Sequence, residues 1–319
     1  MDNFLIISER SYEHWPSFDL LYEWEDELLK NIPGAKLYKN IKRKRGFGFI
    51  DKIGLSPNKI FTWNSKCFHF DISARTRNNF MNAKNHKVCI VDFYLKREQL
   101  SAFYKAYSNV ERLYVSSREV YEFLMANTPA REVSHMPLTL PDKYKLDTDA
   151  EFKKEYDLVL VGRQNSILLK YLEEYAKNYP LKYVYRKEIS NGNFPYYTNT
   201  GEYVGNIITR EDYFSLLKKS KVAFYSTPGM DGGEKRTNGF NQVTPRFLEE
   251  LSSGCNIISR FEDNADTDYF ELGNMTKRVT DYDSFTRAMD ESLSVAPNIN
   301  KYAKYLSQHY TSVVAKLLV

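Results

Sequence analysis

Cysteine is scarce in this chain of 319 residues, and the three cysteines lie far apart. Cys67, Cys89 and Cys255 are odd in number, and the sequence has neither a C-x-x-C pair nor the Cys/His spacing of a zinc site. We therefore expect no disulfide framework and no structural zinc. Free thiols are typical of a protein in a reducing cytoplasm.

Long apolar runs are missing as well. No stretch approaches the roughly 18 apolar residues that cross a bilayer, and residues 1–20 lack the basic start and the apolar core of a signal peptide. We expect a cytoplasmic protein. A peripheral contact with the inner membrane surface stays open, because the basic cluster at residues 42–45 suits anionic lipid head groups or an acidic acceptor as well as a solvated loop.

A strong excess of one charge is also absent. The formal net charge is +4, which does not by itself indicate a nucleic-acid partner. Aromatic residues, by contrast, are abundant, with 25 Tyr and 20 Phe. Tyrosine-rich surfaces suit sugars, because the C–H faces of a sugar stack on the rings while its hydroxyls meet phenol groups.

Two common phosphate-binding signatures do not occur. The sequence contains no G-x-x-x-x-G-K-[ST] loop and no G-x-G-x-x-G after a strand. Glycine is instead concentrated in residues 228–240, together with Lys235 and Arg236. Because glycine allows the backbone to approach a ligand, we expect this loop to lie under a diphosphate or a sugar; a flexible hairpin is the alternative.

Short apolar runs alternate with helical patterns along the whole chain. Strands are expected at 4–7, 88–91, 112–116, 157–162, 181–185, 222–226 and 256–259, and helices at 17–29, 97–106, 117–125, 165–177, 210–220 and from 244. This alternation predicts two α/β, Rossmann-like, doubly wound domains, with ligands at the carboxyl ends of parallel strands. The Pro-containing segment 136–144 is expected to join a domain over residues 1–140 to one over 141–319. Residues 298–319 have the spacing of one amphipathic helix, for which a membrane-surface role is the alternative.

The segment 241–259 is typical of a loop, a capped helix, a glycine stop and a buried strand. Thr244 is the expected N-cap and Pro245 the first helical residue, which leaves free amides at the helix start for an anion. The apolar residues of this helix share one stripe, so we expect Arg246 and Glu249 to lie on the opposite, non-core side. Glu249 could then accept hydrogen bonds from a ribose diol and Arg246 could complement phosphate, although a solvated surface pair would have the same spacing.

Residues 246–254, RFLEELSSG, followed by a strand, resemble the R-x-x-E-A-x-A-C-G-x-x-(I/V) element of group-1 GT-B glycosyltransferases. The resemblance implies that Glu249, five residues before Gly254, binds the donor ribose. Many retaining members have a Glu where this chain has Asn241, so the donor sugar and the anomeric outcome stay open.

Further matches follow from the same resemblance. Gly162-Arg163 is similar to the family's G-R pair, whose Arg contacts the donor diphosphate, and Lys170 is the candidate for the Lys that follows it. Gly205 lies in the segment 204–208, where the family has a backbone contact to the base.

The resemblance implies a metal-independent glycosyltransferase with two domains facing a cleft and a C-terminal helix that packs on the first domain. The donor would be a nucleotide-diphosphate sugar, with UDP or GDP expected, and the acceptor a glycan or a lipid-linked glycan. Asp266-Thr-Asp268 is a literal D-x-D, but we expect a polar turn there rather than a metal site. No other cofactor is expected.

A general base for the acceptor hydroxyl is expected from the first domain. The candidates are Glu13 and His14, in the loop after the first strand, and Asp92, at the end of the strand 88–91. Three alternative functions remain open: a nucleotide-sugar epimerase of the same fold, a glycosyltransferase that modifies DNA bases, and a non-catalytic nucleic-acid-binding protein.

Overall fold

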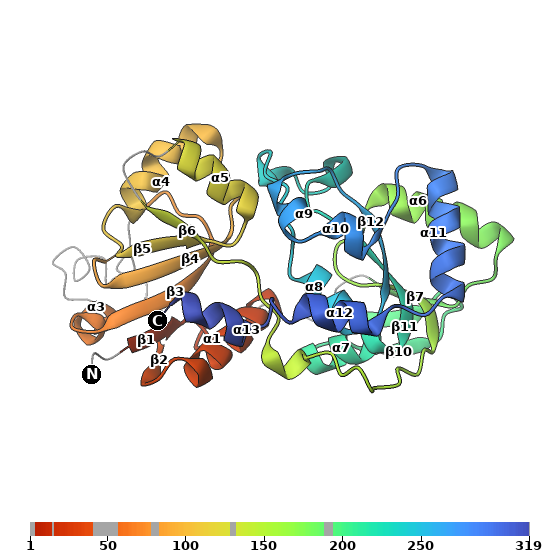
Figure 1. Cartoon of the computed structure of the whole chain (residues 1–319), viewed down its shortest axis with the longest axis horizontal. Coiled ribbons are helices and arrows are strands. Elements are labelled where there is room, and N and C mark those ends of the chain that lie inside the picture. Colours follow the sequence, from red (N-terminus) through yellow and green to blue (C-terminus); the bar gives the residue numbers. More distant parts are fainter. Residues whose placement is uncertain are drawn as a thin grey trace. The chain divides into compact units, whose positions relative to one another are not determined.

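The computed structural model describes residues 4–14, 16–40, 57–77, 83–127, 132–187 and 194–318. The chain forms two compact units (Figure 1). Unit 1 contains Met1–Asp142, Arg236–Phe240 and Thr311–Val319, and unit 2 contains Lys143–Lys235 and Asn241–Tyr310. Within the described residues, no helix is both long enough and apolar enough to cross a bilayer.

Unit 1 is built on a six-stranded sheet in the order β2-β1-β3-β4-β5-β6, and every described pairing is parallel. The strands are β1 (Phe4–Ser8), β2 (Ala35–Lys39), β3 (Lys66–Ser73), β4 (His86–Asp92), β5 (Arg112–Val115) and β6 (Val133–His135). From β1 the chain continues to β2 on one side and then to β3 on the other. The carboxyl ends of β1 and β3 therefore form the switch point at which ligands bind in such sheets.

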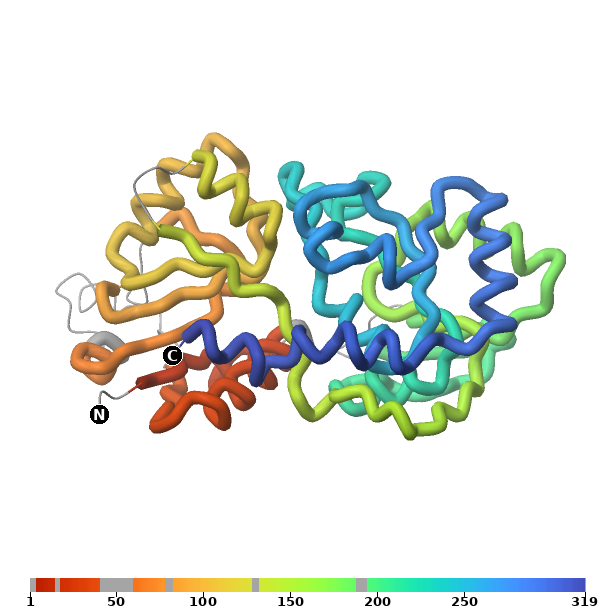
Figure 2. Tube along the Cα trace, in the orientation of Figure 1, coloured from red at the N-terminus to blue at the C-terminus, as the bar shows by residue number. Residues whose placement is uncertain are grey.

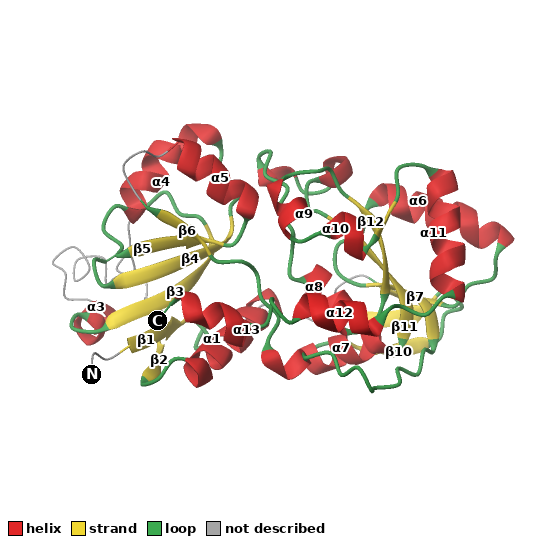
Figure 3. Cartoon of the chain, in the orientation of Figure 1, coloured by secondary structure: helices red, strands yellow, loops and turns green. Residues whose placement is uncertain are grey.

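Helices cover both faces of this sheet (Figure 3). The helices of unit 1 are α1 (Pro16–Asn31), α3 (Pro57–Thr62), α4 (Leu100–Tyr107) and α5 (Arg118–Asn127). Helices α4 and α5 bury Phe103 and Leu124 on one face, while α1 and the chain end bury Leu28 and Val314 on the other. Burial on both faces explains why β4 is a continuous apolar run, as is usual for a central parallel strand.

The C-terminal segment is not the single helix expected over 298–319. It contains α12 (Ile299–Leu306), α13 (Thr311–Val314) and a short 3₁₀ turn, Ala315–Leu317. Between α12 and α13 the helical hydrogen bonding is broken, and the Thr311 N–H donates to the Leu140 carbonyl (3.0 Å). The last residues belong to unit 1, where Lys87 Nζ donates to the Leu318 carbonyl (3.0 Å) and Figure 2 shows the chain end beside the strands.

Unit 2 has a seven-stranded sheet in the order β10-β9-β8-β7-β11-β12-β13. The strands are β7 (Tyr156–Leu160), β8 (Tyr183–Arg186), β9 (Pro195–Thr198), β10 (Tyr203–Asn206), β11 (Ser220–Ser226), β12 (Asn256–Arg260) and β13 (Lys277–Arg278). β8, β9 and β10 form an antiparallel meander, and the remaining pairs are parallel. The switch point lies between β7 and β11, because the chain goes from β7 to β8 on one side and reaches β11 on the other.

The helices of unit 2 are α6 (Ser166–Asn178), α7 (Arg210–Lys218), α8 (Arg246–Ser252), α9 (Ala265–Tyr269), α10 (Leu272–Met275), α11 (Tyr282–Ser294) and α12. One face of the sheet packs against α6 and α11 and the other against α7. The prediction of two Rossmann-like, doubly wound domains is confirmed. All three cysteines are free and buried, as expected.

Candidate functional site

The switch point of unit 2 has a glycine that its backbone requires. Gly162, two residues after the end of β7, has φ 66°, which lies in the left-handed region that favours glycine. A Cβ on Gly162 would also lie only 3.0 Å from Nη1 of Arg246. The turn after β7 is therefore shaped by a side chain from α8.

Arg246 braces this turn. Its Nη1 donates to the carbonyl oxygens of Val161 (2.9 Å) and Arg163 (2.7 Å), on both sides of Gly162. The expectation that Arg246 lies on a free face is wrong, because Nη1 of its guanidinium is bound to the protein backbone. Its effect on a ligand would be indirect, through the position of the Gly162-Arg163 turn.

Glu249 is likewise not on a free face. The residue is only 4% exposed, and its Oε1 accepts a hydrogen bond from Nη2 of Arg210 (2.6 Å), the first residue of α7. The expected non-core side does not exist, since six of the seven α8 residues are buried. Within the described residues, Oε2 of Glu249 accepts no hydrogen bond.

Glu250 is a buried acid that the sequence analysis missed. It is fully buried, and neither carboxylate oxygen has a hydrogen-bond partner in the described part of the chain. Nε of Arg246 lies 3.4 Å from its Oε1. Burial raises the pKa of Glu250 to about 8, and the adjacent Arg246 opposes that rise only partly. No pattern in the sequence distinguishes Glu250 from an exposed helical glutamate.

The start of α8 differs from the expectation. Pro245 occupies the N-cap position and no side chain caps the helix, so Thr244 is not the cap. The Thr244 N–H donates instead to the phenol oxygen of Tyr225 (2.9 Å), and its carbonyl accepts from Phe247 N–H (3.1 Å).

The loop between β11 and α8 is held by polar contacts. Asp231 forms an ion pair with Arg260 (2.7 Å) and accepts from the amide of Asn165 (2.7 Å). The Asn241 side chain accepts from Gly229 N–H (2.8 Å), so this residue stabilises the loop. Glu234 binds Arg163 Nη2 at 2.7 Å.

The remaining predicted ligand residues are dispersed. Lys170 is exposed on α6, and Lys235 is exposed in the loop. Arg236 belongs to unit 1, with its guanidinium carbon 5.7 Å from the ring centre of Tyr94. Gly205 lies at an irregularity in the pairing of β9 with β10, far along the sheet order from β7 and β11.

Two unpaired polar atoms lie at or next to the switch point of unit 2. Thr227 follows β11 directly and is 1% exposed, yet its hydroxyl has no hydrogen-bond partner in the described part of the chain. The same holds for Oε1 of Gln164, which follows the Gly162-Arg163 turn. Buried polar groups are normally satisfied, so these atoms indicate a place for a polar ligand or water.

The switch point of unit 1 carries a charged cluster that was not predicted. Asp71, in β3, is fully buried and accepts hydrogen bonds from Arg75 Nε (2.9 Å) and the Tyr107 hydroxyl (2.5 Å). Glu9, the residue directly after β1, lies 3.9 Å from Arg75 Nη2. Burial raises the pKa of Glu9, while a hydrogen bond from Tyr12 and the charge of Arg75 oppose the rise. Its place two residues after the predicted strand 4–7 could have identified Glu9.

The structure does not bring the three predicted catalytic residues together. His14 is exposed and makes no hydrogen bond to a described residue, and the Glu13 carbonyl accepts from the Tyr22 hydroxyl (2.7 Å). Asp92 ends β4, which is separated from β1 by β3. Of the three, Glu13 lies near enough to Glu9 for its charge to help raise the pKa of Glu9.

The D-x-D segment forms part of α9. Asp266 is fully buried, and its Oδ2 accepts from Val243 N–H (3.0 Å). Among the residues that the structure describes, no group of three or more His, Cys, Asp or Glu side chains could hold a metal ion. The basic cluster at 42–45 lies outside the described residues.

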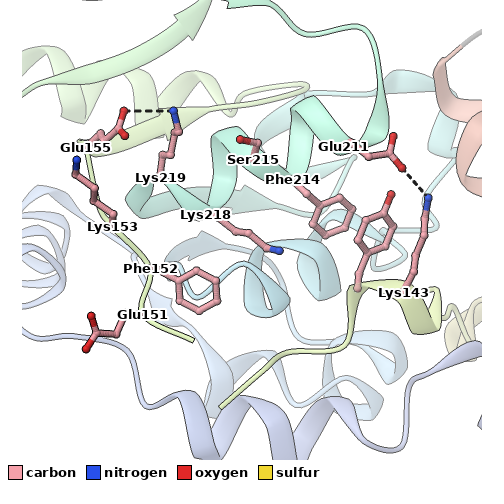
Figure 4. Close-up of a pocket in the computed structure, with 11 residues that line it drawn as sticks. Lys143, Glu151, Phe152, Lys153, Glu155, Glu211, Phe214, Ser215, Lys218 and Lys219 are labelled. Atoms are coloured by element: carbon pink, nitrogen blue, oxygen red, sulfur yellow. Dashed lines mark hydrogen bonds and ion pairs between the residues drawn. The ribbon is translucent and has the colours of Figure 1, made fainter. Parts of the chain in front are cut away.

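A pocket of about 600 Å³ lies elsewhere in unit 2 (Figure 4). Lys153, Glu155 and Lys219 line it just before β7 and β11, so it is at the amino ends of these strands, opposite the switch point. Lys219 pairs with Glu155 (3.4 Å) and Lys143 with Glu211 (2.9 Å). Two of the four lysines that line this pocket are thus paired with carboxylates, and the pocket lies away from the carboxyl ends of the strands.

No protein-family model matches the sequence, and no curated protein matches it. The chain is similar to three solved structures, two of which are titled as glycosyltransferases. The glycotransferase of kitacinnamycin has TM-score 0.45 and 14% identity over 99% of this chain and 97% of that chain. The glycosyltransferase SnogD from Streptomyces nogalater has TM-score 0.42 and 11% identity over 100% and 98%. The GtfA/B complex has TM-score 0.42 and 10% identity over 95% and 59%. Likeness at this level carries no argument about the reaction.

Proposed function

We propose that this protein is a glycosyltransferase that moves a sugar from a nucleoside-diphosphate donor to a glycan or glycolipid acceptor. The observation that carries the proposal is the braced Gly162-Arg163 turn, which lies at the switch point of unit 2 beside the unpaired Thr227 hydroxyl. The sequence resemblance supports it, because the same turn and α8 are the elements that match the family's donor-binding motifs.

Arg163 is the proposed partner of the diphosphate. Its side chain is 50% exposed and, within the described residues, the guanidinium binds only Glu234. A diphosphate can take the place of that carboxylate, since phosphate oxygens match the donor fork of arginine. A guanidinium also neutralises charge that develops on the leaving group, which is how the proposal does without a metal.

Glu249 is the proposed partner of the ribose. Arg210 fixes one carboxylate oxygen, and the other has no protein donor among the described residues. A carboxylate oxygen can accept a hydrogen bond from a diol hydroxyl. In this proposal, Oε2 of the buried Glu249 accepts from the ribose diol.

Glu9 is the proposed general base, in place of Glu13, His14 or Asp92. It lies at the carboxyl end of β1, and burial raises its pKa towards the range that suits a base near neutral pH. Unit 1 is accordingly the proposed acceptor-binding unit.

Calorimetric titration with UDP, GDP, dTDP, CDP and ADP tests the donor site. We expect one of them to bind, and Arg163→Ala to weaken that binding at least tenfold, which is about 1.4 kcal/mol. Arg278→Ala is the matched control, because Arg278 is also a partly exposed arginine held by a carboxylate, at 2.7 Å from Asp263. Absence of binding by all five nucleotides would refute the proposal.

Product analysis then separates the alternatives. A sugar donor that is isomerised without an acceptor would indicate an epimerase, and transfer to duplex DNA would indicate a DNA-modifying enzyme. Salt-sensitive retention on DNA without nucleotide binding would indicate a nucleic-acid-binding protein.

A further inference from the structure

We infer that the antiparallel meander β8-β9-β10 of unit 2 is a second carbohydrate-binding surface, which takes an uncharged glycan chain. Tyr185, Tyr197 and Tyr203 form a row across its three strands, and we call this row the tyrosine ladder. The ladder lies on the side of β7 away from β11, and the pocket beside it reaches Gly162 of the proposed donor site.

The strand register places the ladder on one face of the sheet. Tyr185 pairs with Tyr197, and Tyr197 pairs with Tyr203. Directly paired residues point to the same face, and neighbouring strands are about 4.8 Å apart, so the three tyrosines extend over about 10 Å. The rings of Tyr197 and Tyr203 have centroids 5.2 Å apart, and Tyr203 is 57% exposed. The ladder is therefore long enough for more than one sugar ring.

The ladder is open because of how its strands are connected. The described residues between β8, β9 and β10 contain no helix. In the parallel part of the sheet, by contrast, helices lie between β7 and β8, between β11 and β12, and between β12 and β13. Helix α6 covers only the start of this face, where its Leu169 and Leu172 lie beside β8. Four aromatic rings with hydroxyl groups, including Tyr183, thus remain at least partly accessible.

A pocket of about 310 Å³ adjoins the ladder. Leucines of β7 and α6 form its apolar side, and Tyr183 and Tyr185 line it together with four polar residues, Gln164, Glu173, Arg186 and Asn199. This volume lies at the lower end of the range of small-molecule sites, which are largely apolar with a few polar groups. Oε1 of Gln164 is buried and accepts no hydrogen bond from a described residue, so it can accept one from a ligand hydroxyl.

The charges favour a neutral ligand over a nucleic acid. The Glu173 carboxylate and the Arg186 guanidinium both line the pocket, so the charges of its lining offset each other. Lys182, at the start of β8, is compensated by Glu202 at 3.5 Å. The Lys187 ammonium lies 4.0 Å from the centre of the Tyr197 ring, which shows that this ring face attracts a cation. Sugar C–H bonds, which are weakly positive, can replace the ammonium there, and the displaced lysine can donate to hydroxyls.

The ligand class follows from these residues alone. That the bound glycan is also the acceptor of the transferase rests on the proposed function. A surface of this kind would keep a polymeric acceptor on the enzyme between transfers.

Affinity electrophoresis tests the surface. The intact protein is run through native gels that contain a soluble glucan, galactomannan or xylan, each with and without excess oligo(dT). We expect at least one polysaccharide to slow the wild-type protein, and Tyr203→Ala and Tyr185→Ala to reduce that retardation at least fivefold. Tyr269→Ala is the matched control, because Tyr269 is 39% exposed on α9, away from the meander.

The outcomes are distinct. Retardation by none of the three polysaccharides, or equal retardation of wild type and Tyr203→Ala, would overturn the inference, as would displacement of the polysaccharide by oligo(dT). Nucleotide calorimetry on Tyr203→Ala separates the two proposals, because we expect this variant to bind nucleotide as the wild type does. If instead the proposed donor site is wrong, the wild-type protein would bind no nucleotide but would still be slowed by the polysaccharide. A thermal melt of each variant identifies a loss of fold.

Discussion

Arg246 lies against Gly162 so closely that a Cβ on the glycine would come within 3.0 Å of Nη1. The same nitrogen binds the carbonyls on both sides of that glycine. We predict that Gly162→Ala strains the turn and displaces the guanidinium, with a loss of roughly 2 kcal/mol in the free energy of unfolding. Urea unfolding measures this loss, and calorimetry should show weaker nucleotide binding by the same variant.

Gly201→Ala separates the effect of backbone strain from the effect of the collision with Arg246. Gly201 has φ 93° but nothing within 4 Å of its Cβ position, so it shares the backbone strain without the collision. We expect Gly201→Ala to be less destabilised and to bind nucleotide normally. Equal stability and binding of both variants would mean that the contact with Arg246 has no role in the site.

The buried pair of Glu249 and Arg210 leads to a second prediction. The side chains are 5% and 14% exposed, so Glu249→Ala leaves a charge with little water to solvate it. We expect a loss of roughly 3 kcal/mol in unfolding free energy, and a double variant with Arg210→Ala that loses less than the sum of the two single losses. The exposed pair Arg118–Glu122 (2.8 Å) is the control, with an expected coupling below about 1 kcal/mol. Additive losses at Glu249 and Arg210 would contradict the prediction.

The position of Glu9 leads to a third prediction, which rests on the proposed function. If Glu9 takes the proton of the acceptor hydroxyl, Glu9→Gln should lower kcat by about 10²–10⁴ while nucleotide binding persists. Because burial raises the pKa of Glu9, wild-type activity should fall as the pH drops through a value above the ordinary carboxyl range. His14→Gln, in the same loop, is the control, because the charge of Glu13 itself acts on Glu9. An equal loss of kcat in His14→Gln would remove the assignment.

The sequence was sufficient to predict the central strands. β4, β7, β11 and β12 are short apolar runs, because both faces of a parallel sheet are buried. β3 was missed because His69 and Asp71 interrupt its apolar pattern. The buried Asp71 is stabilised by hydrogen bonds from Arg75 and Tyr107. Tyr107 is 36 positions away in the sequence, so a local pattern cannot indicate this partner. β9 was missed because its four residues lie in a segment that is otherwise polar.

The donor-site prediction depended on helical spacing. Spacing correctly places Arg246 and Glu249 near each other on α8, but it cannot show what covers the second side of a helix. Here the partner of Glu249 comes from α7, 39 residues earlier, and the partners of Arg246 are backbone carbonyls after β7. The expected exposure of both residues was therefore wrong, and their role in binding a donor stays a prediction.

Glu250 leads to a prediction about pH. Its folded-state pKa is raised to about 8 from an ordinary value of 4.5, so between these values the folded protein holds a proton that the unfolded chain has released. Stability from this group is complete below about pH 4.5 and is lost as the pH rises towards 8, by at most about 1.4 kcal/mol per pH unit. Glu250→Gln cannot titrate, so its unfolding free energy should fall less steeply than that of wild type between pH 5 and pH 8.

Urea unfolding of both proteins at several pH values measures the difference in slope. Glu25→Gln is the matched control in unit 1, because burial also raises the pKa of Glu25, to about 7, where Arg10 binds it at 2.9 Å. Its slope should change mainly below pH 7, whereas the change in Glu250→Gln should continue to about pH 8. Parallel curves for wild type and Glu250→Gln would show that Glu250 is ionised in the folded protein, and that Arg246 then balances a full buried charge while it holds the turn at Gly162.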